Sequence, residues 1–194
     1  MLRIIEKLAR TMVVLGGVVL VLLVVLTCAS VIGRSLNGML HSDLAQSLLG
    51  EVADWLINAG IGPITGDFEI LEAGVAFSIF AFLPYCQLHG GHATVDVFTS
   101  FLPVKANKYI IAFWEVVLTA VILLITWRLY AGMLSKMGNG ETTFLLQFPV
   151  WWGYAASFVP AVVACVVGLY CAIGRVAEIV TGRDFLPKLE GAVH

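Results

Sequence analysis

The residues best suited to chemistry are one carboxylate within an apolar stretch, Glu115, and a short polar run that contains His89, His92 and Asp96. Glu115 lies about six residues inside the stretch that begins near Tyr109, and an ionisable group at such a depth is a functional candidate. A carboxylate there can carry a proton or bond to a polar group on a neighbouring helix. We keep both hypotheses for Glu115.

His89, His92 and Asp96 could be drawn as metal ligands. The double glycine after His89 predicts that a helix ends there, so the three side chains would not share one helical face. We therefore expect a turn with hydrogen-bonding polar residues and no metal site. A b-type haem needs histidines in the interiors of facing spans, whereas His41 and His194 lie outside the apolar stretches. We expect no cofactor bound by this chain alone.

The composition indicates an integral membrane protein. Of the 194 residues, 60% are hydrophobic and only 12% are charged, whereas soluble domains have about 45–50% and 25%. The net charge of −2 argues against a nucleic-acid partner. The four cysteines lie within apolar runs and form no C-x-x-C pair, which favours small buried residues over disulfides or zinc ligands.

Four apolar stretches are long enough to cross a bilayer of about 30 Å. They are residues 12–33, 70–89, 108–128 and 149–175. We expect an all-α membrane protein with one membrane domain over residues 1–194. The first stretch exceeds the 7–15 residues, roughly, of a signal-peptide core, which favours a retained helix. Lys and Arg concentrate in the two tails and the second connection, so both termini are predicted to be cytoplasmic.

The connection after the first span is predicted to contain an amphipathic helix over residues 40–59. Its apolar side chains recur at helical spacing, and Trp55 would anchor it in the interface on the periplasmic side. Asp43 and Asp54 fall on the polar face and Glu51 at its margin. Helices that bind only anionic lipid usually carry Lys and Arg there, so the acids favour a partner protein. A helix that only rests on lipid remains the alternative.

A series of short motifs occurs along the chain in a distinctive order. The series is Val31-x-x-Arg34, the acids Glu69 and Glu72, Gly91-His92-Ala93-Thr94-Val95-Asp96, Leu102-Pro103, Trp114 and Phe148-Pro149-x-Trp151. It resembles the small membrane subunit of tripartite ATP-independent periplasmic (TRAP) transporters. The inner loop of that family typically reads Gly-x-His-Ile-x-Val-Asp, followed by Leu-Pro. This chain has Ala93 in place of the Ile, and the resemblance covers about residues 10–185.

The resemblance implies a heterodimer in a bacterial or archaeal cytoplasmic membrane. A large multi-span subunit would carry the substrate and sodium sites, and a soluble periplasmic protein would deliver an organic anion such as a carboxylate. This chain would be a scaffold without enzymatic activity. On this model Asp43, Glu51 and Asp54 would contact the delivering protein or the large subunit.

The resemblance also suggests roles for matched residues. His92 and Asp96 would bond to backbone groups and set the inner turn. Arg34 would pair with Glu69 or Glu72 or hold a lipid headgroup, because an interfacial arginine binds anions in a bidentate manner. The plainer alternative is an arginine that extends toward the water without a partner.

Two other functions remain open at this point. The first is a self-contained small transporter that couples to protons through Glu115. The second is the membrane anchor of a redox complex that shares a haem with another subunit. Transport by the isolated chain would distinguish the first, and a visible absorption band the second.

Overall fold

The computed structural model describes residues 2–91 and 104–181, and within these ranges it is helical apart from its loops and one isolated β-bridge. The helices are α1 (Leu2–Leu40), α2 (Asp43–Asn58), α3 (Asp67–His89), α4 (Val104–Asn139) and α5 (Trp151–Thr181). All except α2 are long and apolar enough to cross a membrane. The prediction of an all-α protein with four spanning helices is thus confirmed.

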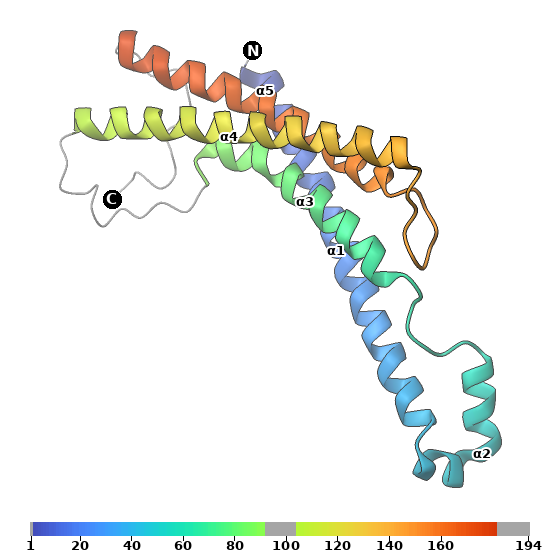
Figure 1. Ribbon diagram of the computed structural model, residues 1–194. Helices are drawn as coiled ribbons and strands as arrows, with labels where there is room; N and C mark the ends of the chain where they lie inside the picture. The colour runs from blue at the N-terminus through green and yellow to red at the C-terminus, as the bar shows by residue number, and fades with distance from the viewer. Residues whose placement is uncertain (1, 92–103, 182–194) are drawn as a thin grey trace.

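The four long helices form two pairs. Figure 1 shows α1 beside α3 and α4 beside α5, with the second pair crossing the first at a steep angle. The main contacts between elements are α1 with α3, α3 with α5, and α5 with α4. α3 and α5 are therefore the two central helices, and α1 and α4 lie at the two edges.

The helices define two ends of the molecule. We call them the terminal end and the loop end. At the terminal end, where α1 begins and α5 ends, Ala9, Leu88 and Cys171 pack in one buried cluster. At the loop end, α3 begins close to the second half of α1 and to the connection between α4 and α5. α2 lies beyond this end, beside the last turns of α1 (Figure 1).

Small residues let α1 and α3 approach closely. A Cβ added to Gly16 would lie 2.8 Å from the Cβ of Ala81, so only glycine fits this position. On α3 the hydroxyl of Ser78 donates to the carbonyl of Gly16 at 3.2 Å and to that of Gly74 at 2.9 Å. Close backbone contact with serine hydrogen bonds is typical of helix pairs in membranes.

The helices extend beyond the predicted spans. α1 has 39 residues and α4 has 36, so both continue past the apolar stretches of 12–33 and 108–128. Neither contains proline, and a helix satisfies its own backbone hydrogen bonds in water as well as in lipid. Hydropathy identifies the part of a helix that lies in lipid. The ends of the helix are instead set by helix-breaking residues.

The helix predicted over residues 40–59 needs correction. Its first residue, Leu40, is the last residue of α1, and α2 runs only from Asp43 to Asn58. Gly50 interrupts α2 with a non-helical backbone, φ 31° and ψ −102°. Glycine tolerates this conformation because it has no Cβ. The segment is therefore two short helical pieces rather than one continuous amphipathic helix.

Candidate functional site

At the terminal end, one glutamine joins three helices through hydrogen bonds. The side-chain nitrogen of Gln87 on α3 donates to Oε1 of Glu115 and to Oγ1 of Thr119 on α4, each at 3.0 Å. Thr119 in turn donates to the carbonyl of Gly168 on α5 at 3.2 Å. Gln87 and Thr119 are only 2% and 3% exposed. We call these four residues the inner junction.

Gly168 lets α5 approach this junction closely. A Cβ at that position would lie 3.1 Å from Oε1 of Gln87 and 3.3 Å from Oγ1 of Thr119. The contact supports the hypothesis that Glu115 bonds to a neighbouring helix. Gln87 is absent from the sequence-predicted residues, although an amide within an apolar span is itself a signal of inter-helix bonding.

The terminal end also contains a charge pair on α5. Arg175 donates to Glu178 at 3.0 Å across one helical turn, and their side chains are 13% and 8% exposed. Two charges removed from solvent are tolerable because each offsets the other. Glu115, Arg175 and Glu178 thus have side-chain partners within the same chain, whereas Oε1 of Gln87 forms no hydrogen bond in its described part.

At the loop end, Asp67 connects α1 to the first turn of α3. Ser30 on α1 is fully buried and donates to Oδ2 of Asp67 at 2.5 Å, while it accepts the backbone N–H of Ile64 at 3.3 Å. Arg34, one turn further along α1, places Nη2 3.6 Å from the same carboxylate oxygen. The arginine side chain is 55% exposed.

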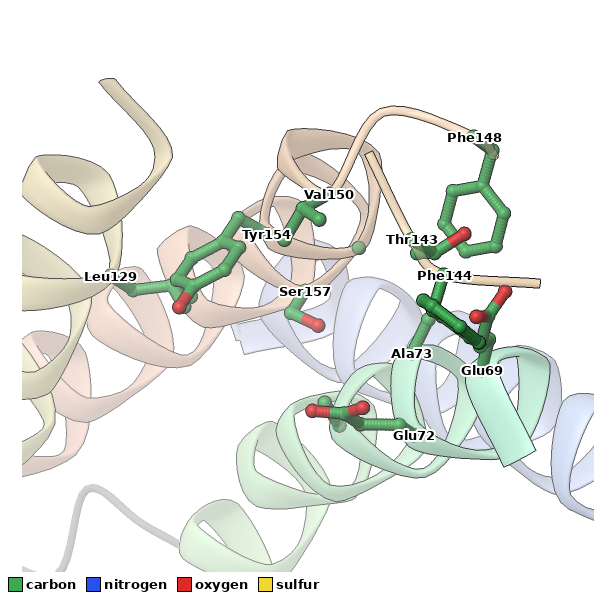
Figure 2. Close-up of a pocket in the computed structure, with 12 residues that line it drawn as sticks. Glu69, Glu72, Ala73, Leu129, Thr143, Phe144, Phe148, Val150, Tyr154 and Ser157 are labelled. Atoms are coloured by element: carbon green, nitrogen blue, oxygen red, sulfur yellow. The ribbon is translucent and has the colours of Figure 1, made fainter. Parts of the chain in front are cut away.

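This geometry corrects the predicted partner of Arg34. Its carboxylate partner among the described residues is Asp67, and not Glu69 or Glu72. Asp67 is the first residue of α3 and faces α1. Glu69 and Glu72 face α5 and the connection between α4 and α5 instead, as Figure 2 shows.

Glu69 holds the connection between α4 and α5 against α3. Its Oε1 accepts the backbone N–H of Leu145 at 2.6 Å, and its Oε2 accepts that of Leu146 at 2.9 Å. The connection is itself closed by a hydrogen bond from the N–H of Thr143 to the carbonyl of Phe148, at 2.9 Å. Glu69 is therefore a structural residue that orders residues 141–150.

The start of the same connection is fixed by a second charged contact. Lys136 forms an ion pair with Glu141, and the side-chain amide of Asn139 donates to Glu141 at 3.0 Å. The hydrogen bonds from Lys136 and Asn139 hold the pKa of Glu141 below its ordinary value of 4.5. The carboxylate thus stays ionised at neutral pH and closes the end of α4.

A cavity of about 450 Å³ lies beside Glu69, between α3, α4, α5 and residues 141–150 (Figure 2). Its polar lining includes Glu72 on α3 and Ser157 on α5. Much of the remaining lining is apolar and comes from residues with small or apolar side chains: Ala73, Ala76, Leu129, Phe144, Phe148 and Val150. We call this space the outer cavity.

The acids on α2 lie apart from the outer cavity. Asp43 begins α2, while Glu51 and Asp54 are exposed on its second half. Trp55 is 68% exposed and packs against little of this chain. α2 makes its contacts mainly with α1, so the structure does not bring Glu51 and Asp54 close to Glu72.

The histidine motif is described only in part. His92 and Asp96 lie outside the described residues. His89 stacks on Tyr85 of the preceding turn, with ring centroids 4.1 Å apart, and its Nδ1 lies 3.2 Å from the carbonyl of Tyr85. Within residues 2–91 and 104–181, no group of three or more His, Cys, Asp or Glu side chains is arranged to hold a metal ion.

The family of the chain follows from a comparison with known proteins. The model for the DctQ component of tripartite ATP-independent periplasmic transporters matches residues 23–178, which include α2, α3, the inner junction and the outer cavity. No curated protein and no solved structure matches the chain. The family match confirms the resemblance seen in the motif order. The chain belongs to the DctQ family, the small membrane subunits of TRAP transporters.

Proposed function

We propose that this chain is the scaffold subunit that pairs with the large transport subunit of a sodium-coupled, binding-protein-dependent importer of an organic anion such as a carboxylate. Family membership is the observation that carries the proposal. The distribution of burial supports it. Half of the most apolar window of α5 is buried within the chain, against 11% of that of α1. The apolar surface of α1 therefore needs lipid or another protein.

The proposed topology places both termini in the cytoplasm of a bacterium or archaeon, with the whole chain forming one membrane domain. The positive-inside rule supports this direction, since basic residues cluster in the tails and in the connection between α3 and α4. The loop end is then periplasmic. The two pieces of α2 lie in the outer interface, with Trp55 as an anchor.

A periplasmic loop end fits the delivery of substrate by a soluble protein. In this proposal the substrate and sodium sites belong to the large subunit. Asp43, Glu51 and Asp54 on α2 supply negative charge to the surface that meets the delivering protein or the large subunit. Exposed charges of this kind mainly affect the rate of encounter and lose their effect at high salt.

The contacts of Glu115 favour a scaffold over a self-contained proton-coupled transporter. Its carboxylate accepts a hydrogen bond from Gln87 within the inner junction. A proton-coupling group must change its protonation during each cycle, and such a change would disturb a contact that joins α3 to α4. In the scaffold proposal, Glu115 is a structural acceptor.

Reconstitution into liposomes tests the function. The complex of this chain with its large subunit, supplied with the periplasmic binding protein and a labelled organic acid, should take up substrate under an inward sodium gradient. Glu115→Gln should retain this uptake because the amide oxygen still accepts from Gln87. Uptake by this chain alone, driven by a proton gradient and lost in Glu115→Gln, would contradict the proposal.

A further inference from the structure

The outer cavity contains polar groups that have no partner in the described part of the chain. Ser157 is 1% exposed, and its hydroxyl forms no hydrogen bond. Glu72 belongs to none of the ion pairs of the described residues. Figure 2 shows the Glu72 carboxylate and the Ser157 hydroxyl both turned into the space between α3 and α5. Glu72 is exposed, but Ser157 is buried, and buried polar groups are paired in nearly all native proteins. The unpaired Ser157 hydroxyl therefore points to a group from outside the described part of the chain.

The charge of the lining selects a cation. Two carboxylates, those of Glu69 and Glu72, border the cavity, and no Lys, Arg or His is among the residues that line it. Both oxygens of Glu69 already accept backbone N–H groups. Of the two carboxylates, Glu72 is therefore the one that forms no compensating contact within the described part of the chain. An opposite charge is the strongest available complement to such a carboxylate.

The walls restrict what kind of cation fits. A small metal ion needs several oxygen ligands at short distance, whereas the walls are largely apolar, including Ala76, Leu129 and Val150. A phospholipid amine headgroup would place its phosphate beside carboxylates with no cation to balance it. A long carbon stem with a charged tip fits both the apolar walls and the acid. The rings of Phe148 and Tyr154 line the same space and favour a cation further.

We propose that the outer cavity receives one lysine or arginine side chain of the large subunit, with Glu72 as its counter-ion and the hydroxyl of Ser157 as a hydrogen-bond acceptor. This inference rests on the pairing proposed above. The side chain would enter at the loop end between α3 and α4, which both contact α5 and whose mutual hydrogen bonds, from Gln87, lie at the terminal end. Because Glu72 makes no ion pair with the residues that the structure describes, its effect should appear only when the complex forms.

A comparison of purified complexes tests the role of Glu72. The wild-type chain and Glu72→Gln are each co-expressed with the large subunit, and the fraction of large subunit retained is measured as detergent harshness and salt increase. Glu72→Gln should lower that fraction at least threefold, while the Tm of the isolated small subunit stays unchanged. Ser157→Ala should act in the same direction but less. Glu6→Gln, which removes the same charge from an exposed position near the start of α1, should retain the large subunit as the wild type does.

Photo-crosslinking identifies the occupant directly. Phe144 lies at the rim of the outer cavity and is 87% exposed, so p-benzoylphenylalanine can replace it there with little disturbance. The expected product is a crosslink to a large-subunit peptide that contains a lysine or arginine. Crosslinks to phospholipid alone, or a Glu72→Gln complex as resistant as the wild type, would overturn the inference and leave the scaffold function intact. Failure of the wild-type chain to pair at all would instead overturn the proposed function, and the inference with it.

Discussion

The two ends of this molecule differ in how far their side-chain hydrogen bonds join the spanning helices to one another. At the terminal end, the side-chain nitrogen of Gln87 reaches both Glu115 and Thr119, and Thr119 reaches the backbone of α5. At the loop end, the hydroxyl of Ser157 and the carboxylate of Glu72 face a cavity of about 450 Å³. The terminal end is thus held together by this chain alone.

The difference indicates how such a subunit is constructed. Helices that must stay together without a partner need internal hydrogen bonds, because apolar side chains gain little from leaving lipid for protein. A surface that meets a partner keeps polar groups for that partner. The inner junction should therefore control the stability of the isolated chain, and the outer cavity that of the complex.

The largest effect on the isolated chain is expected from Gly168→Val. The added side chain would overlap Gln87 and Thr119, and overpacking of a close contact costs about 1–3 kcal/mol. We expect a clear fall in the Tm of the detergent-purified protein. Gly17→Val is the matched control, because nothing lies within 4 Å of a Cβ at that helical position. Equal losses in the two variants would argue against the inner junction as the stabilising contact.

A smaller effect is expected from the hydrogen bond between Gln87 and Glu115. Gln87→Leu should destabilise the isolated chain by about 1–2 kcal/mol, the upper range for polar contacts between membrane helices. Gln87→Leu, Glu115→Leu and the double variant form a thermodynamic cycle. Residues in direct contact should give a non-additive result, with the double variant losing less than the sum of the single losses. Strict additivity would show that the two side chains do not interact.

At the loop end, Ser30 should matter more than Arg34. Ser30→Ala removes a buried hydroxyl that bonds to Asp67 and to the backbone of Ile64, which costs about 1 kcal/mol. Arg34→Ala removes a long, half-exposed ion pair, worth about 0–1 kcal/mol. Thermal unfolding of the two variants in the same detergent shows which of them loses more stability. A larger loss for Arg34→Ala would mean that the arginine has a further partner, such as a lipid headgroup.

The smallest effect is a pH dependence at the connection between α4 and α5. The pKa of Glu141 is held below 4.5 in the folded chain by Lys136 and Asn139. Its stabilising contribution is therefore fully present above the unfolded pKa and is lost as the pH falls through the lower folded pKa. The Tm difference between the wild type and Glu141→Gln should shrink toward zero as the pH decreases from 7 to below about 4. A difference that stays constant would contradict this assignment.

The spans could be predicted from the sequence because they depend on local composition. Apolar runs of about 20 residues have few alternatives to a spanning helix. The position of Glu115 within such a run indicated an inter-helix contact before its partner was known. The break at Gly50 was not predicted, since the apolar periodicity continues on both sides of it and glycine alone does not specify a backbone angle.

The loop end was predicted less well because its contacts join distant parts of the chain. The sequence places three acids near the start of α3 that could each pair with Arg34. Only the fold shows that Asp67 is the one that faces it. Glu69 binds backbone groups 76 and 77 residues away, which no local pattern reveals. Ser157 has no charge and no motif, so its place in the outer cavity could be found only from the structure.

Affinity purification of this chain from its native membrane in mild detergent, with mass spectrometry of the co-purified proteins, tests the central claim most directly. The account predicts one large multi-span subunit in a one-to-one ratio with this chain. A homo-oligomer of this chain, with no large subunit in stoichiometric amount, would contradict it.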